Sequence, residues 1–183
     1  MIKAKMEFPE KSKRTTEETF TWDEVKALLD KEFMRRAEYI AKIVTALKEK
    51  FGDKVIDETK KVIYNIGYEK GKARAAIVKA KGEEPTLENL AELIAHKTSK
   101  LYFGTTPELT ENKLVIREDY CPLPRKWKEM GFTDKEIIEF CLMFDQVDKG
   151  MVEGYNDSFK AELSGCKTLA EKGYCQMVVE KKK

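Results

Sequence analysis

Residues 113–124 read KLVIREDYCPLP, and this stretch decides the fold class. Its opening run, Lys113 to Arg117, is short and rich in β-branched side chains, which is typical of a strand. Pro122 and Pro124 then stop the run, because proline cannot donate to a β ladder and favours an extended backbone before it. The strand follows a half-chain whose apolar pattern is helical, so we expect an α+β protein.

Three further runs complete the expected sheet. Leu101-Tyr102-Phe103 comes before the central run, and 159–163 and 175–180 are expected to be the two closing strands. Side chains alternate between the two faces of a strand, so Cys175, Met177 and Val179 should share one face.

Apolar residues at helical spacing dominate the N-terminal half. Thr21 with Glu24 three residues later fits a capping box, and the pattern from Trp22 to Lys50 predicts one long helix. Asp53 is expected to cap a second helix. In that helix Gly67 and Gly71 favour close packing against another helix, or a kink between two helices.

More helices are expected around the strands. Thr86 should cap a third, residues 125–130 a short one, and Thr133 a long one running from Asp134 to about Val152. The prediction is therefore a flexible polar arm over residues 1–21 and a single α+β domain over residues 22–183. That domain has a mostly helical N-terminal half packed on a small antiparallel sheet, with one long helix inserted between strands.

Composition excludes several classes of protein. The chain has 183 residues, with 42% hydrophobic and 37% charged residues, which excludes disorder as the main state. A net charge of +2 does not provide the basic field of a nucleic-acid binder. No apolar run approaches the ~20 residues that span a bilayer, and the N-terminus lacks the apolar core of a secretory signal. We expect a cytoplasmic protein, without nucleic-acid or membrane partners, whose long N-terminal helix could pair in a homodimer.

The sharpest local motif lies on the last long helix. Cys141, Asp145 and Asp148 are spaced four and three residues apart, so on a continuous helix they stack on one face that overlaps the apolar stripe. A carboxylate there needs a cation, a proton, a metal or a substrate to offset its desolvation. The alternatives are an ordinary buried salt bridge, a helix rotated so that both aspartates reach water, and the wall of a pocket that carries a thiol and a carboxylate.

Other candidates are weaker and keep a structural alternative. Cys121 lies at the expected end of a strand, either as a reactive group or as a small buried thiol. Tyr155 and Asn156 follow the long helix in a turn, where the Asn156 amide could orient a polar substrate group. His96 is the single histidine, which excludes a multi-histidine metal site. Cys166 is treated as incidental.

The C-terminal half resembles a known family. The features that carry the likeness are Cys121-Pro122, the Cys-x-x-x-Asp spacing of Cys141 and Asp145, Gly154-Tyr155-Asn156, and the ending Gly173-Tyr174-Cys175. These features are similar to those of the L-2-amino-thiazoline-4-carboxylic acid hydrolase family. The family's ending continues as Cys-Asp-Phe, whereas this chain has Cys175-Gln176-Met177.

The resemblance implies a hydrolase that acts on a C–N bond of a small cyclic amidine acid. It implies Cys121, Cys141, Asp145 and Cys175 as catalytic residues, and Asp148, Tyr155 and Asn156 as substrate-binding residues. Two routes suit these residues. Either Cys121 or Cys175 is a nucleophile with Asp145 as proton shuttle, or cysteine thiolates hold a divalent metal that activates water.

Two questions stay open at this stage. The substrate carboxylate needs a cation, for which Arg117, Arg125 and Lys167 are unranked candidates. A small-molecule sensor of the same fold, which binds without turnover, is the alternative to an enzyme.

Overall fold

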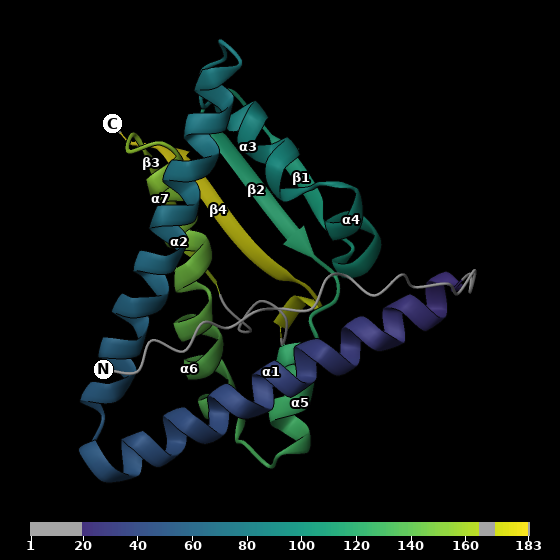
Figure 1. Ribbon diagram of the computed structural model, residues 1–183, viewed down its shortest axis with the longest axis vertical. Coiled ribbons are helices and arrows are strands. Elements are labelled where there is room, and N and C mark those ends of the chain that lie inside the picture. Colours follow the sequence, from purple (N-terminus) through teal and green to yellow (C-terminus); the bar gives the residue numbers. More distant parts are fainter. Residues whose placement is uncertain (1–19, 165–170, 183) are drawn as a thin grey trace, which may run out of the picture.

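The protein is represented by a computed structural model that describes residues 20–164 and 171–182. Figure 1 shows α1 along the lower edge, α2 rising from its end, and the sheet with its covering helices above. The predicted arm falls outside the described residues except for 20 and 21. The elements are α1 (Trp22–Phe51), α2 (Lys54–Ala80), α3 (Leu87–Ile94), α4 (Lys97–Phe103), β1 (Thr106–Leu109), β2 (Lys113–Glu118), α5 (Pro122–Glu129), α6 (Asp134–Phe144), α7 (Gln146–Tyr155), β3 (Phe159–Leu163) and β4 (Cys175–Lys181).

A four-stranded antiparallel sheet in the order β1-β2-β4-β3 carries the first hydrophobic core. Along β2, Leu114 and Ile116 are buried on one face, while Lys113 and Arg117 lie on the other face. The inner face packs against α3, α7 and part of α2. The buried members of this core are Ala75, Leu87, Leu90, Ala91, Leu114, Ile116, Val152, Tyr155, Phe159, Ala161 and Val179. The expected α+β class and the antiparallel sheet are confirmed.

Four glycines allow α2 and α7 to touch backbone to backbone. A β-carbon at Gly67 would overlap the carbonyl oxygen of Val147, and one at Gly71 would overlap that of Met151. The relation is reciprocal, because Gly150 and Gly154 of α7 face the carbonyl oxygens of Tyr64 and Tyr68 on α2. Of the two interpretations of Gly67 and Gly71, close helix packing is confirmed, and α2 continues past both without a break.

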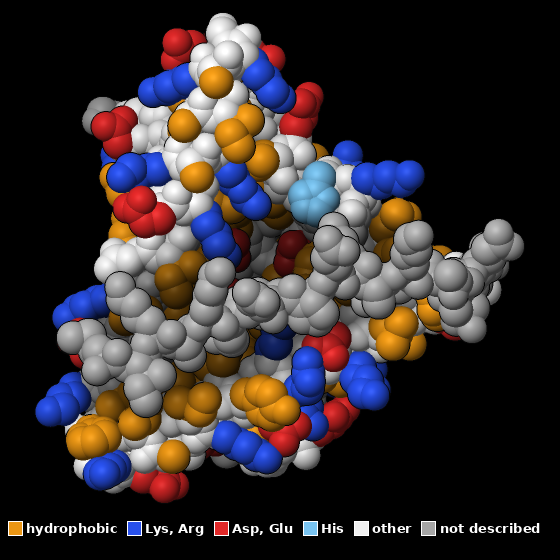
Figure 2. Space-filling view, viewed as in Figure 1, with side chains coloured by type: hydrophobic (Ala, Val, Ile, Leu, Met, Phe, Trp, Pro, Cys, Tyr) orange, Lys and Arg blue, Asp and Glu red, His pale blue; other side chains and the backbone are white. Residues whose placement is uncertain are grey.

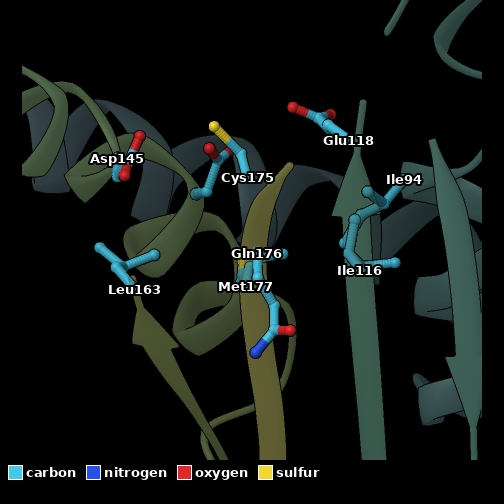
Figure 3. Close-up of a pocket in the computed structure, with 9 residues that line it drawn as sticks. Ile94, Ile116, Glu118, Asp145, Leu163, Cys175, Gln176 and Met177 are labelled. Carbon is cyan, nitrogen blue, oxygen red and sulfur yellow. The ribbon is translucent and has the colours of Figure 1, made fainter. Parts of the chain in front are cut away.

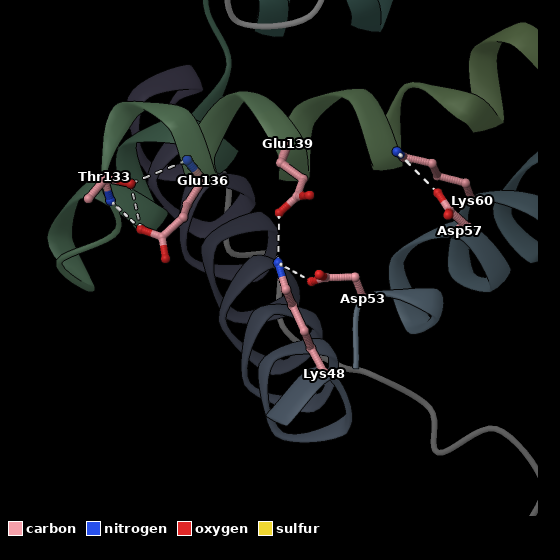
Figure 4. Close-up of polar contacts among 7 residues, drawn as sticks. All are labelled: Lys48, Asp53, Asp57, Lys60, Thr133, Glu136 and Glu139. Atoms are coloured by element: carbon pink, nitrogen blue, oxygen red, sulfur yellow. Dashed lines mark hydrogen bonds and ion pairs between the residues drawn. The ribbon is translucent and has the colours of Figure 1, made fainter. Parts of the chain in front are cut away.

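A second hydrophobic core lies where α1 crosses α5 and α6. Trp127 is fully buried in it, and its indole N–H donates to the backbone carbonyl of Ala37 at 3.2 Å. Both predicted capping boxes, at Thr21 and Thr133, are present. Figure 4 shows the Thr133 box beside Lys48, whose ammonium lies 3.2 Å from both Asp53 and Glu139 and ties α1 to the start of α2 and to α6.

An aspartate on α1 anchors the segment that leads to Cys121. The Oδ1 atom of Asp30 accepts hydrogen bonds from the hydroxyls of Tyr102 and Tyr120, both at 2.8 Å. Burial acts to raise the pKa of Asp30, but the two tyrosines and the charge of Lys26 outweigh burial and lower it. The ionised carboxylate therefore fixes Tyr120, and with it the neighbouring residue Cys121, against α1.

Two predictions from the sequence are wrong, namely that residues 101–103 form a strand and that the chain is extended at residues 122–124. Leu101–Phe103 belongs to α4 and not to a strand, because the Tyr102 ring is buried against Phe33 at 5.3 Å and tertiary packing overrides β propensity. Pro122 and Pro124 do not hold the chain extended, since they form the first turn of α5, where a missing N–H breaks no hydrogen bond.

Two further predictions, about helix boundaries, are also wrong. The helix expected from Asp134 to Val152 is interrupted at Asp145, so that α6 and α7 are separate. The side chain of Gln146 donates to the carbonyl of Leu142 at 3.1 Å, and Asp148 N–H turns back to Asp145 in a tight turn. Asp53 precedes α2 but makes no capping hydrogen bond, because its carboxylate faces Lys48.

The outer surface of α1 carries apolar side chains at four-residue spacing. Tyr39, Ile43, Leu47 and Phe51 are each at least 40% exposed. Figure 2 shows orange side chains among charged ones along this lower edge of the molecule. A homodimer through this helix stays a prediction. In the described ranges, no helix combines the length and apolar character needed to cross a membrane.

The glycine contact can be tested by adding one methyl group. Replacing Gly by Ala in a helix ordinarily stabilises it by about 1 kcal/mol. We expect Gly71→Ala and Gly150→Ala to do the opposite and to lower the free energy of unfolding by about 1–3 kcal/mol, because the backbones must separate. Chemical denaturation measures the change. Ala73→Leu, on the exposed side of α2, is the control and should stay within about 0.5 kcal/mol of the parent; a stabilising Gly71→Ala would contradict the packing.

Candidate functional site

The candidate site begins where the inner face of the sheet stops being apolar. On β2, Leu114 and Ile116 are followed on the same face by Glu118. Glu118 is the register partner of Cys175, the first residue of β4. Directly opposed residues of antiparallel strands bring their β-carbons to roughly 5 Å, so this carboxylate and this thiol are neighbours at the end of the sheet.

A small cavity opens at this end of the sheet. It has a volume of ≈ 80 Å³, and Figure 3 shows Asp145, Cys175 and Glu118 arranged around it, with apolar side chains below. For comparison, a dry cavity of about 150 Å³ holds benzene. The space therefore encloses only part of a ring-sized ligand, and the rest of such a ligand would extend through the open side of the cavity. The lining residues are Ile94, Ile116, Glu118, Asp145, Asp148, Leu163, Cys175, Gln176 and Met177.

The interruption between α6 and α7 supplies the opposite wall. Asp145 is the single residue between the two helices, and Asp148 lies in the first turn of α7. Asp145 is half-buried, while Asp148 has an exposed side chain although protein surrounds it on several sides. That combination describes a carboxylate on the wall of an open cavity and not one on the outer surface.

Burial raises the pKa values of all three carboxyl groups, and negative charge on neighbouring acids adds to the rise for Glu118 and Asp145. Burial, and then the charge of Asp148, raise the pKa of Glu118 to about 7, against a weak hydrogen bond from Thr105. Burial and the charges of Asp148 and Glu118 raise the pKa of Asp145 well above its ordinary value. Full ionisation of the three carboxyl groups is therefore less favourable than for carboxylates in water, and a bound cation would favour it.

Asp148 differs from the other two because it faces positive charge. Burial raises its pKa to about 6, while Arg74 and Lys70 on α2 act to lower it. Both cations lie along α2 on the side that the glycine contact brings against α7. Of the three carboxyl groups, Asp148 is therefore the one whose ionised form is stabilised by nearby positive charge.

Both cysteines at the cavity are thiols at neutral pH. Burial, with the charges of Asp145 and Glu118, raises the pKa of Cys175 to about 12. Burial also raises the pKa of Cys121, against a backbone hydrogen bond from Leu123, and Cys175, Glu118 and Asp145 raise it further. The thiolate is the reactive form of cysteine, so neither sulfur is an activated nucleophile in the unliganded protein.

The structure brings together some of the predicted site residues. Asp145, Asp148 and Cys175 line the cavity, and Cys121 is close enough for their charges to act on it. Cys141 is not among the residues that line the cavity; it is buried in the second core with 6% exposure, and it is disulfide-bonded. The predicted helical spacing of Cys141 and Asp145 is retained, since the Asp145 N–H donates to the Cys141 carbonyl at 2.8 Å.

Tyr155 and Asn156 lie away from this cavity. Tyr155 is 2% exposed in the first core. The Asn156 amide donates to the carbonyl of Pro85 at 2.8 Å, and its oxygen accepts from Ser158, so it stabilises the turn after α7. His96 accepts from the Ser99 N–H and caps α4. Cys166 falls outside the described residues.

Sequence reasoning missed Glu118 and the cations of α2. The signal for Glu118 was the alternation of β2, which carries it onto the face of Leu114 and Ile116. Arg74 had no such signal, because its position depends on the contact between α2 and α7. Within residues 20–164 and 171–182, no group of three or more His, Cys, Asp or Glu side chains is arranged to hold a metal ion.

These features define an α+β protein with helices over one face of an antiparallel sheet and a small acidic cavity at its end. Residues 32–178, well over half of the chain, match the profile of L-2-amino-thiazoline-4-carboxylic acid hydrolases, and the chain belongs to this family. No curated protein matches the sequence.

A solved structure shares the fold. It is a trafficking protein particle complex subunit 3 from Naegleria fowleri, covalently bound to palmitic acid. The two chains are 17% identical, with a TM-score of 0.52, and the match covers 83% of this chain and 96% of that one. At this identity the likeness concerns the fold alone.

The raised pKa of Asp145 makes stability depend on pH in a defined direction. A protonated Asp145 contributes stability fully below about pH 4, the ordinary value for the unfolded chain, and this contribution is lost as pH rises through the raised pKa. We therefore expect Asp145→Asn to raise the free energy of unfolding relative to the parent more at pH 8 than at pH 4.5. The free energy of unfolding of each protein is measured by denaturant titration at both pH values.

Glu111→Gln is the matched control for that comparison, since Glu111 is in solvent on the turn between β1 and β2. An equal effect of Asp145→Asn at the two pH values would mean that this carboxyl group is not held protonated by its surroundings.

Proposed function

We propose that this protein is a hydrolase that opens the ring of a small cyclic amidine acid in the cavity at the end of the sheet. The single observation that carries the proposal is the set of three carboxyl groups of unequal surroundings around a space of ≈ 80 Å³. Carboxyl groups whose environments push their pKa values apart are the usual basis of paired acid and base catalysis. Membership of the hydrolase family supports the same reaction class.

Acidic walls suit the cationic part of such a substrate. A protonated cyclic amidine presents N–H donors in a plane, as a guanidinium does, and carboxylates accept such donors with charge-assisted hydrogen bonds. Binding this cation would also offset the repulsion among Glu118, Asp145 and Asp148. The apolar side chains of Ile94, Ile116 and Met177 would contact the rest of the ring.

The two aspartates take different roles in this mechanism. Asp148, which faces Arg74 and Lys70, is the base that removes a proton from the attacking water. Asp145, which faces other acids, is the proton donor to the ring nitrogen. Water adds to the carbon between sulfur and nitrogen, the ring C–N bond breaks, and that nitrogen leaves as an amine while the carbon keeps the new oxygen as a carbonyl.

The cysteines serve this reaction as neutral groups. Cys175 and Cys121 are protonated in the unliganded cavity, so attack by water needs less rearrangement of charge than attack by sulfur. Cys175 lines the cavity opposite Glu118, and Cys121 is buried close enough for the charges of Glu118 and Asp145 to act on it. The route with a nucleophilic cysteine is the competing version of the same activity.

Turnover can be measured with L-2-amino-thiazoline-4-carboxylate as the substrate and mass spectrometry as the readout. Hydrolysis gives a product heavier by one water. We expect Asp148→Asn and Asp145→Asn to lower kcat by about 10²–10⁴-fold, the usual range for loss of a catalytic acid or base. Activity of the parent should rise with pH as Asp148 ionises near pH 6. The exposed Asp157→Asn, in the turn after α7, is the control and should keep parental activity.

The roles of the thiols are tested separately with Cys175→Ala and Cys121→Ala. We expect each to reduce kcat less than Asp148→Asn does, because water and not sulfur attacks. A covalent adduct on Cys175, trapped at low pH and seen in the intact mass, would replace this mechanism with the nucleophilic one.

A second candidate function is binding without turnover. The observation that favours it is the fold shared with the trafficking particle subunit, a protein that is covalently bound to palmitic acid. A rise in melting temperature with the ring acid, without any product, would favour this sensor function over the hydrolase. Absence of both would leave neither function supported for this ligand.

A further inference from the structure

Among residues 20–164 and 171–182, one cation near the cavity has no acidic partner in direct contact. Arg74 lies on α2, half-buried, one turn after Lys70 and on the flank that faces α7. Within the described part of the chain its guanidinium contacts the Met151 sulfur and forms no ion pair. A guanidinium has five N–H donors, and a half-buried one therefore favours binding of a further hydrogen-bond acceptor such as a ligand carboxylate.

The position of Arg74 relative to the cavity follows from the helix contact. Gly71 packs against the backbone at Met151, which sets Arg74 one turn further along α2 beside α7. Its charge acts on Asp148, which is itself a wall of the cavity. Figure 2 shows a hollow in the middle of this face where blue and red side chains lie close together.

Charge therefore changes sign across the site. Glu118 lies at the end of the sheet, Asp145 and Asp148 lie on the opposite wall, and the positive charges of α2 act on Asp148. A ligand with a cation at one end and an anion at the other matches this order. A simple cation would leave Arg74 without an acceptor.

The other cations proposed for a substrate carboxylate are placed elsewhere. Arg117 pairs with Glu108 and stacks on the Tyr174 ring at 5.2 Å, on the outer face of the sheet. Arg125 pairs with Glu129 at 3.3 Å on the surface of α5. Lys167 lies outside the described residues.

From these observations we propose that Arg74 binds the carboxylate of the ligand, with the cationic ring directed toward Asp145 and Glu118. Arg74 is thus the residue that selects zwitterionic ring acids over rings without a carboxylate. This assignment rests on the proposed function for the nature of the ligand, but it concerns binding and does not require turnover. The planar guanidinium can hold a carboxylate through two parallel hydrogen bonds, which lysine cannot do.

The test compares two ligands by calorimetry on the full chain at pH 7.5. One is L-2-amino-thiazoline-4-carboxylate, and the other is 2-amino-thiazoline, which lacks the carboxylate. We expect Arg74→Gln to weaken binding of the acid by about 10- to 100-fold, the effect of losing a charged hydrogen-bond partner, and to leave binding of 2-amino-thiazoline within about twofold.

Two further variants separate this role from a structural one. Arg74→Lys keeps the positive charge that Asp148 faces and should still weaken binding of the acid. This variant tests the assignment even if Arg74→Gln fails to fold. Lys72→Gln, two residues away and exposed beside Glu69, is the control and should change neither affinity.

Each result has a defined meaning. Equal weakening of both ligands, or no weakening of the acid, would overturn the assignment and leave Arg74 as a partner of Asp148 alone. No binding of the acid by the parent protein would overturn it as well. The expected pattern of affinities without any product would support the carboxylate site and contradict the hydrolase.

Discussion

The backbone contact between α2 and α7 is the constraint on which the rest of the structure depends. Gly67 and Gly71 on one helix, and Gly150 and Gly154 on the other, each face a carbonyl oxygen of the partner helix. Because no side chain separates the helices, the flank of α2 is held beside the flank of α7. This contact sets Arg74 next to Asp148 and also sets the position of α7 over β3.

The site lies where two hydrophobic cores meet. The sheet core ends at Ile116 and Met177, and the core beneath α1 ends at Phe144. Between them the chain turns at Asp145, and the polar groups of the cavity occupy the gap. Such an arrangement opposes stability, since ionised carboxyl groups are kept partly from water. Proteins commonly retain destabilising groups of this kind where their chemistry is needed.

The fold alone does not define the activity. The same arrangement of helices and sheet occurs in a subunit of a trafficking particle that carries a fatty acid. The proposed function rests instead on the content of the cavity, in particular Glu118 opposite Cys175 and the two aspartates at the turn between α6 and α7. A small volume and a change of charge across it favour a compact polar ligand over a long hydrocarbon chain.

Much of the fold was determined by the sequence itself. The capping boxes at Thr21 and Thr133 fixed where two helices begin, because their hydrogen bonds are local. Strand alternation placed Cys175, Met177 and Val179 on one face, and only neighbouring residues are needed for that pattern. The sequence likewise marked Asp145 and Cys175 as candidates, and family resemblance pointed to the same residues.

Tertiary structure alone decided which of these groups meet. Cys141 and Asp145 are one helical turn apart, yet Cys141 is buried in the second core whereas Asp145 lines the cavity. Burial of Tyr102 against α1 makes a helix of a segment with the composition of a strand. The approach of Arg74 to Asp148 follows from packing between helices that are remote in sequence. Periodicity reports the direction of a side chain within its own element, whereas a cavity depends on how separate elements face one another.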